Sequence, residues 1–226
     1  NHAIKPDDPF KIIYGLEGHL VNDLKTPVTN SKGQDFDNHY VVFDIETTGF
    51  SPVSDKIIEI GAVKIQNGKV TDSFSEFINP EIPIPRKIVK LTDINDSMVM
   101  DAPTVDVILP RFVQFCEDCI MVAHNADFDM SFINAKCKEQ GIDVDYTYID
   151  TMRISQALFP TQARHNLDAL CKTLNLVNEK HHRAVADAEV TGKIFMRFQE
   201  MLADKDIHNL DELNEYCKLP KEAIAR

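Results

Sequence analysis

The feature that most constrains the fold is the pair Asn67-Gly68, which separates two strand-like segments. Residues 56–66 (KIIEIGAVKIQ) precede the pair and residues 69–80 (KVTDSFSEFINP) follow it. An Asn-Gly pair between two such segments is typical of a tight turn in an antiparallel hairpin. A third strand-like segment, YVVFDIE, comes shortly before at 40–46. The sequence therefore predicts a sheet that contains this hairpin.

Helix-like and strand-like segments alternate after the hairpin. Helical spacing of apolar residues predicts helices at 103–118, 128–140, 151–159, 167–176 and 184–202, and short strands are predicted at 120–125 and 148–150. Pro110 is expected to kink or break the first helix. Asn209 with Glu212 three residues later resembles a capping box and predicts a short terminal helix. Antiparallel strands followed by this alternation predict an α/β fold with a mixed sheet.

The charge balance limits how this chain can contact nucleic acid. Lys and Arg number 24 against 36 Asp and Glu, which gives a net charge of −12. A broad basic surface that coats a duplex is therefore excluded, and a polyanion would have to be handled through bound cations. The start of the sequence, NHAIKPDDPF, lacks the features of a signal peptide, and no apolar run is long enough to cross a membrane. We expect a cytoplasmic protein without a membrane partner.

The cysteines predict no metal site. There are 5, an odd number, and only Cys116 and Cys119 form a CxxC pair. One such pair without a second pair or nearby histidines is a weak zinc signal, so reduced structural thiols are expected.

Two acidic residues lie at the end of the first predicted strand. Asp44 and Glu46 stand two apart, directly after the apolar residues 41–43, so on a strand both carboxylates project from one face. Carboxylates beside an apolar core repel each other unless a cation compensates them or one of them is protonated. For this segment alone, the alternative is a strand end whose acids point to solvent.

Two further segments place an acid near the start of a predicted helix: HNADFD at 124–129 contains Asp129, and HRAVAD at 182–187 contains Asp187. Taken singly, each acid is explained as well by helix capping or by a solvent-facing position. Together with Asp44 and Glu46 they supply oxygen ligands of the kind that suits a pair of Mg²⁺ or Mn²⁺ ions, which can clamp a scissile phosphate. A histidine has an ordinary pKa of about 6.5, so His182 can take a proton from water at neutral pH.

The segments DIETTG at 44–49, HNADFD at 124–129 and HRAVAD at 182–187 resemble, in residue type and order, the motifs of the DEDDh (DnaQ-like) 3′–5′ exonucleases. The resemblance covers residues 39–203 and implies an RNase H-like fold, with a mixed central sheet and helices on both faces. It implies two bound divalent cations, Mg²⁺ or Mn²⁺, held by Asp44, Glu46, Asp129 and Asp187, with His182 as general base. The implied reaction is hydrolysis of the 3′-terminal phosphodiester of single-stranded or frayed DNA, which releases nucleoside 5′-monophosphates.

The same resemblance implies a set of nucleotide-binding residues, namely Thr47, Thr48, Gly49, Leu91, Asn125, Phe128 and Arg183. Thr47 would lie near the terminal 3′-hydroxyl, Phe128 against the terminal nucleotide, and Leu91 against the last base. Leu91 belongs to LTDI at 91–94, where Asp93 replaces the usual glycine. Candidate backbone contacts are the cations that cluster before the last motif, namely Arg164, His165, Lys172, Lys180, His181 and Arg183. Each is equally explained as a solvated surface charge, which is the favoured interpretation for Lys172 and Lys180.

The flanks resemble part of the Gram-positive PolC-type replicative polymerases, in which a proofreading exonuclease is inserted into a PHP domain. Residues 1–38 would be a piece of that PHP domain plus a linker, with Glu17 at its metal site, and residues 204–226 a C-terminal flank with a short helix. The implied partners are a single-stranded or mispaired 3′ end of DNA and the polymerase and PHP domains of the same parent chain. The isolated domain is expected to be a monomer.

Two alternatives stay open at this point: an exoribonuclease of the same family, and a non-catalytic module that binds nucleic acid or acts as a scaffold.

Overall fold

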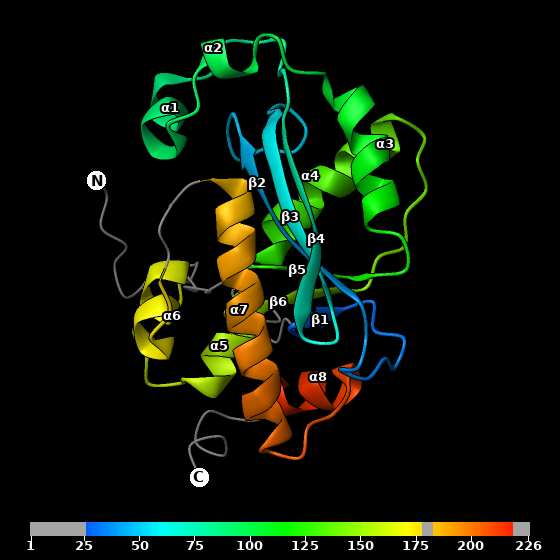
Figure 1. Ribbon diagram of the computed structural model, residues 1–226, viewed down its shortest axis with the longest axis vertical. Helices are drawn as coiled ribbons and strands as arrows, with labels where there is room; N and C mark the ends of the chain where they lie inside the picture. The colour runs from blue at the N-terminus through cyan, green and yellow to red at the C-terminus, as the bar shows by residue number, and fades with distance from the viewer. Residues whose placement is uncertain (1–25, 178–182, 219–226) are drawn as a thin grey trace, which may run out of the picture.

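The computed structural model describes residues 26–177 and 183–218. Its centre is a sheet of six strands in the order β1-β6-β5-β2-β3-β4 (Figure 1). The strands are β1 Val28–Thr29, β2 Tyr40–Thr47, β3 Ile57–Gln66, β4 Lys69–Phe77, β5 Ile120–Ala123 and β6 Tyr148–Asp150. Strands β2, β5 and β6 run parallel, whereas β3, β4 and β1 pair antiparallel with their neighbours. The predicted α/β fold with a mixed sheet is confirmed.

The predicted hairpin is formed by β3 and β4. Asn67 (φ 51°) and Gly68 (φ 69°) both have positive φ angles at its turn. This backbone conformation matches the twist of the two strands, and Asn and Gly adopt it at low steric cost.

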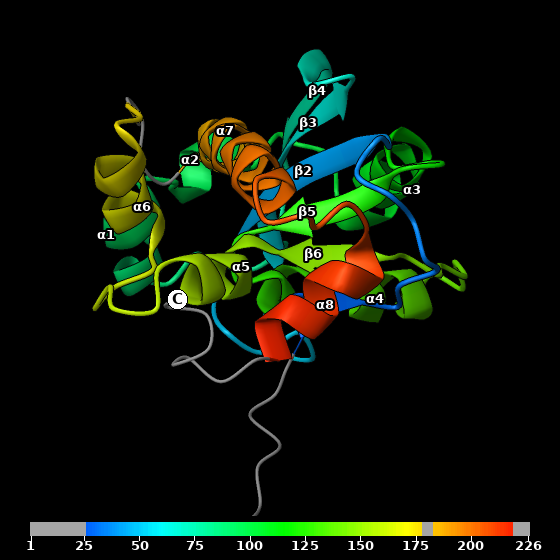
Figure 2. The same ribbon diagram turned by 90° about the horizontal axis from the view of Figure 1, so that it is seen from below.

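Helices cover both faces of the sheet (Figure 2). They are α1 Arg86–Thr92, α2 Asp96–Val99, α3 Val105–Phe115, α4 Ala126–Glu139, α5 Thr151–Leu158, α6 Leu167–Leu174, α7 Ala184–Ala203 and α8 Leu210–Lys218. Side chains alternate between the faces along a strand. In β2, Val42 packs in the core beneath α7, whereas Val41 and Phe43 pack in the opposite core with α3 and α4.

The five longer helices that we predicted are present, with each end within three residues of the predicted one, and α8 begins after Asn209 as the capping box indicated. Of the predicted kink or break at Pro110, the break does not occur, because Pro110 lies inside a continuous α3. Pro110 and Asp106, whose carbonyl loses its helical donor, are both exposed, so water can satisfy that carbonyl. Helices α1 and α2 were not predicted, because so few residues carry no clear period.

The segment that we predicted to be a linker contributes to the sheet. Val28 in β1 is 2% exposed and pairs with Ile149 of β6. Its backbone N–H also donates to Asn214 Oδ1 of α8 at 2.9 Å. A two-residue strand has no detectable alternation, which is why the sequence pattern indicated only a loop. The segment predicted to resemble a PHP domain, with Glu17, lies largely outside the described residues.

Within the residues described, none of the helices combines the length and the apolar character that crossing a bilayer requires. All five cysteines are free thiols.

Candidate active site

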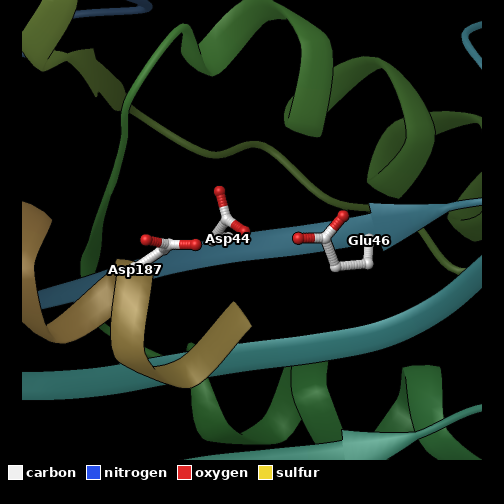
Figure 3. A group of neighbouring side chains, drawn as sticks. All are labelled: Asp44, Glu46 and Asp187. Atoms are coloured by element: carbon white, nitrogen blue, oxygen red, sulfur yellow. The ribbon is translucent and has the colours of Figure 1, made fainter. Parts of the chain in front are cut away.

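Three carboxylates meet over the end of β2. Asp44 and Glu46 lie on the face of β2 that continues from Val42, the face covered by α7. Asp187 lies in the first turn of α7 and reaches the same place. Carboxylate oxygens of Asp44, Glu46 and Asp187 all lie within 4.8 Å of one another, and Figure 3 shows the three side chains grouped above the strand.

The start of α7 is fixed by β3. Glu59 is 1% exposed and accepts hydrogen bonds from Arg183 Nη2 at 2.9 Å and from the Ala184 backbone N–H at 3.1 Å. Gly61 lets the helix backbone come close, since a Cβ atom there would lie 1.9 Å from Val185 N. These contacts set where Asp187, two residues further on, enters the site.

Asp129 reaches the site from α4. Its Oδ1 accepts a hydrogen bond at 3.2 Å from the backbone N–H of Ile45, which lies between Asp44 and Glu46. The helix begins after Asn125, whose φ of 67° is left-handed. Asp129 is 3% exposed, so its carboxylate is held against the strand rather than turned to solvent.

A second buried acid supports this turn. Asp150 at the end of β6 is 2% exposed, and its Oδ1 accepts from the backbone N–H groups of Asn125 at 3.0 Å and Met152 at 2.9 Å. Its Oδ2 accepts from Arg153 Nε at 3.0 Å, and Arg153 also bonds Asp127 in the first turn of α4. Asp150 thus joins the starts of α4 and α5.

The acids border one cleft of about 310 Å³. Its lining consists of Asp44, Ile45, Glu46, His124, Asn125, Phe128, Asp129, Asn166, Leu167, Asp168 and Asp187. Of the predicted residues, the structure brings together the four carboxylates with Asn125 and Phe128. His182, the predicted base, lies outside the described residues, as do Lys180 and His181.

The other predicted nucleotide-binding residues are not part of the cleft lining. Thr47 donates to the Gly49 carbonyl at 2.6 Å, and the buried Thr48 accepts from the Lys56 backbone N–H at 2.9 Å. Leu91 is exposed on α1. Arg183 is bonded to Glu59, and its guanidinium carbon lies 5.0 Å from the ring centre of Phe77.

Three carboxyl groups of the site have raised pKa values. Burial raises the pKa of Asp44 well above its ordinary value, and the nearby carboxylates of Asp129 and Glu46 raise it further. Burial, helped by the carboxylates of Glu59 and Asp187, raises the pKa of Glu46 to about 8, against the opposing effect of Arg183. The pKa of Asp129 is also raised, chiefly by burial, although the Ile45 N–H opposes the shift. In the metal-free site, the raised pKa values favour the protonated form of these carboxyl groups, and bound cations would balance their charge instead.

This donor set fits hard divalent cations. Carboxylate oxygens are the preferred ligands of Mg²⁺ and Mn²⁺, and several must converge before an ion loses part of its water shell. Asp44, Glu46 and Asp187 converge from two elements that are far apart in sequence, with Asp129 in the same cleft. Metal binding would remove the repulsion that raises their pKa values.

The sequence patterns missed three residues that shape the site: Glu59, Gly61 and Asp150. A charged residue inside the apolar run of β3 was the available signal for Glu59. Asp150 precedes a predicted helix, where a capping role could have been predicted. Gly61 gave no comparable signal, because its importance comes from a helix more than 120 residues later in the chain.

A fold and an acidic site of this kind define a nuclease-like class of hydrolase. The chain belongs to the exonuclease family RNase_T, whose model matches residues 41–195. It is 45% identical over 204 residues to the "DNA polymerase III PolC-type" of Caldanaerobacter subterraneus subsp. tengcongensis, covering 90% of this chain and 15% of that protein. The chain therefore spans about 15% of the length of this relative.

Solved structures share the fold. Exonuclease X in complex with 5′ overhanging duplex DNA matches with a TM-score of 0.62 at 23% identity, covering 79% of this chain and 99% of that one. The nuclease domain of 3′hExo, a DEDDh family member bound to rAMP, matches with a TM-score of 0.64 at 17% identity, covering 75% of this chain and 94% of that one. The predicted RNase H-like fold is confirmed.

Proposed function

We propose that this exonuclease domain removes nucleotides from the 3′ end of single-stranded or frayed DNA and releases nucleoside 5′-monophosphates. The observation that carries the proposal is the convergence of Asp44, Glu46 and Asp187 within 4.8 Å, with Asp129 in the same cleft. A DNA substrate is supported by the name of the polymerase relative and by the DNA complex of Exonuclease X.

The carboxylates would hold two divalent cations, Mg²⁺ or Mn²⁺. When bound, such ions supply stabilisation for the charge that develops on a scissile phosphate. Asp44, Glu46, Asp129 and Asp187 are the proposed ligands. The buried contacts of Glu59 with α7 and of Ile45 with Asp129 keep these ligands in place before substrate arrives, which lowers the reorganisation needed for reaction.

His182 is the proposed general base and accepts the proton of the attacking water. Asn125 and Phe128 line the cleft and would contact the terminal nucleotide. Thr47, the last residue of β2, would lie near its 3′-hydroxyl, and Thr48 and Gly49, which follow the strand, would also contact the nucleotide. Leu91 would contact the last base from α1. For Arg183, the bond to Glu59 favours a role in holding the start of α7, with any nucleotide contact made by its exposed edge.

In its biological setting, the domain would proofread within a larger cytoplasmic polymerase chain that also has PHP and polymerase domains. This setting is supported by the PolC-type relative, because the chain matches only 15% of the length of that much longer protein. We place the exonuclease domain at 39–203, with 26–38 and 204–218 packed on it as flanks. The isolated domain is proposed to be a monomer. Selectivity for mispaired ends would come from the lower cost of fraying them.

The test compares four 5′-labelled substrates in Mg²⁺: single-stranded DNA, RNA of the same sequence, a primer with a mispaired 3′ end and a primer with a matched 3′ end. We expect products that form a ladder shortening from the 3′ end. Hydrolysis should be faster on DNA than on RNA, faster on the mispaired than on the matched primer, and absent in Asp44→Ala. Faster cleavage of RNA would move the assignment to an exoribonuclease, an alternative favoured by the rAMP complex of 3′hExo. Binding without any cleavage would instead indicate a non-catalytic module.

The base is tested separately. His182→Ala should lower kcat far more than it weakens DNA binding, and it should remove the limb of the pH-rate profile that reports the base. A profile unchanged by this substitution would exclude the role.

A further inference from the structure

Helix α1 is a basic segment on an acidic protein. Its seven residues include the cations Arg86, Lys87 and Lys90 and no acid, whereas the whole chain has a net charge of −12. All three cations are exposed. Arg86 and Lys90 are four residues apart and so lie on one face of the helix, about 5–6 Å from each other.

Among the described residues, these three cations have no acidic partner. Some other exposed cations pair with neighbouring acids, as in Lys32–Asp145, Arg111–Glu76, Arg197–Glu200 and Lys218–Glu215, whereas others, such as Lys69 and Lys138, form no ion pair with a described residue. No ion pair formed within the described residues, 26–177 and 183–218, involves Arg86, Lys87 or Lys90. The adjacent acids in the sequence, Glu81 and Asp93, do not neutralise them by contact.

A chain of ring contacts connects α1 to the catalytic cleft. Lys87 Nζ lies 6.0 Å from the ring centre of Phe50. The ring of Phe50 lies 6.3 Å from that of Phe128, which lines the cleft. Both views place α1 on the same side of the molecule as α6, whose first residues also line the cleft (Figures 1 and 2). Lys87 is therefore linked through Phe50 to Phe128 in the cleft lining, and Arg86 and Lys90 belong to the same short helix.

We propose that Arg86, Lys87 and Lys90 bind phosphates of the single DNA strand upstream of its terminal nucleotide. This inference rests on the proposed function, because it concerns the substrate of the same site. An acidic domain cannot attract a polyanion through its overall field, so a local group of unpaired cations must supply the backbone contacts. Arginine and lysine beside exposed aromatic and apolar side chains are the usual components of a single-strand track.

The position of these contacts differs from the one predicted from the sequence. The predicted cations precede the last motif, and of these His165 is bonded to Ser155 and Gln162 within the fold. Arg164 and Lys172 remain exposed. Helix α1 is a different element from the one that carries the predicted cations. Its cations would hold the DNA strand at a point away from the metal ligands.

The test is a triple variant, Arg86→Gln with Lys87→Gln and Lys90→Gln, assayed on substrates of increasing length. The shortest is the p-nitrophenyl ester of thymidine 5′-monophosphate, which has no upstream phosphate, followed by (dT)2, (dT)4 and (dT)8. We expect the ratio of variant to wild-type KM to rise from near unity on the ester to about tenfold on (dT)8. The ratio of kcat values should stay near unity throughout.

A binding measurement gives a readout independent of catalysis. Without metal, the dependence of log Kd for labelled (dT)8 on log salt concentration should become shallower by about 2, because each lost single-strand contact removes roughly 0.7. The matched control is Lys69→Gln with Lys138→Gln and Lys205→Gln, which removes the same charge from exposed positions at the β3–β4 turn, the end of α4 and the loop after α7.

The outcomes separate the two proposals. Equal losses in both triple variants would show a general charge effect and overturn the role of α1. Unchanged KM and salt dependence in the α1 variant, with the ester still hydrolysed, would overturn this inference and leave the proposed function intact. If wild-type protein hydrolyses neither the ester nor (dT)8, the proposed function fails, while the metal-free binding measurement still decides the role of α1.

Discussion

Gly61 offers a way to move one metal ligand without touching it. An alanine Cβ at this position would lie 1.9 Å from Val185 N and 2.1 Å from Ala184 C, where ordinary contact begins at 3.4 Å. Both obstacles are backbone atoms, so no side chain can rotate away. The start of α7 must therefore retreat by about 1.5 Å, and Asp187, in the same turn, retreats with it.

The expected cost is large for catalysis and moderate for stability. A displacement of about 1 Å from a productive geometry can reduce a rate by roughly 100-fold, or about 2.7 kcal/mol of transition-state stabilisation. Overpacking should lower the free energy of unfolding by about 1–3 kcal/mol. Gly61→Ala should therefore still fold at 25 °C, with kcat on single-stranded DNA in Mg²⁺ at least about 100-fold lower.

The assay pairs single-turnover hydrolysis of 5′-labelled DNA with thermal melting, with and without Mg²⁺. The matched control is Gly192→Ala on α7, because a Cβ there would approach the flexible end of Ile65 at 3.0 Å and would otherwise make ordinary contacts, at 3.7 Å, with side-chain atoms of Val42 and Val63. That change should affect stability but leave kcat within about threefold. If Gly61→Ala keeps a near-normal kcat and a normal Mg²⁺-induced rise in Tm, α7 is not held by this contact and the reasoning is wrong.

Three further predictions concern the acids. Asp44→Asn should cut turnover by at least about 1,000-fold, because it removes a proposed metal ligand. It should also raise the Tm of the metal-free protein, because it removes a buried carboxyl group that neighbouring carboxylates repel. A lower metal-free Tm would contradict this. Since folded Glu46 has a pKa of about 8 against an ordinary 4.5, the folded state binds more protons between these values. The metal-free free energy of unfolding should therefore fall as pH rises from 4.5 to 8. Urea titrations can measure the slope, which Glu46→Gln should reduce, whereas an unchanged slope would refute the assignment. Asp150→Ala should destabilise the fold by about 3 kcal/mol and weaken the Mg²⁺-induced rise in Tm. Asp150→Asn keeps the acceptor for the Asn125 N–H and should restore that rise. An equal loss in both variants would show that the negative charge of Asp150, and not this hydrogen bond, supports metal binding.

Local patterns in the sequence were enough to predict the sheet, most helices and the acids of the site. The hairpin follows from Asn67-Gly68, because this turn is determined by the two residues that form it. The pairing of Asp44 with Glu46 follows from strand alternation. The prediction that these two acids meet Asp187 depended on the ordered set of three motifs, because no single segment indicates it.

What could not be predicted depends on contacts between distant parts of the chain. Glu59 bonds the Ala184 N–H across 125 positions, and nothing near either residue indicates the other. The same holds for Asp150, which accepts a hydrogen bond from the Asn125 N–H 25 positions earlier in the chain. Asp93 is an instructive departure, since it has a left-handed φ of 56° at the end of α1, a conformation that aspartate tolerates where glycine is usual.

The double hydrogen bond between Val28 and Asn214 has a consequence for the two ends of the folded unit. Val28 N–H donates to Asn214 Oδ1 at 2.9 Å, and Asn214 Nδ2 donates back to the Val28 carbonyl at 3.1 Å. This clasp closes the folded unit beside α8, at the end of α7 remote from Asp187 (Figure 1). The points at which the chain enters and leaves the folded unit therefore lie side by side and away from the carboxylates. Ends that lie close together allow a domain to be inserted into a longer chain.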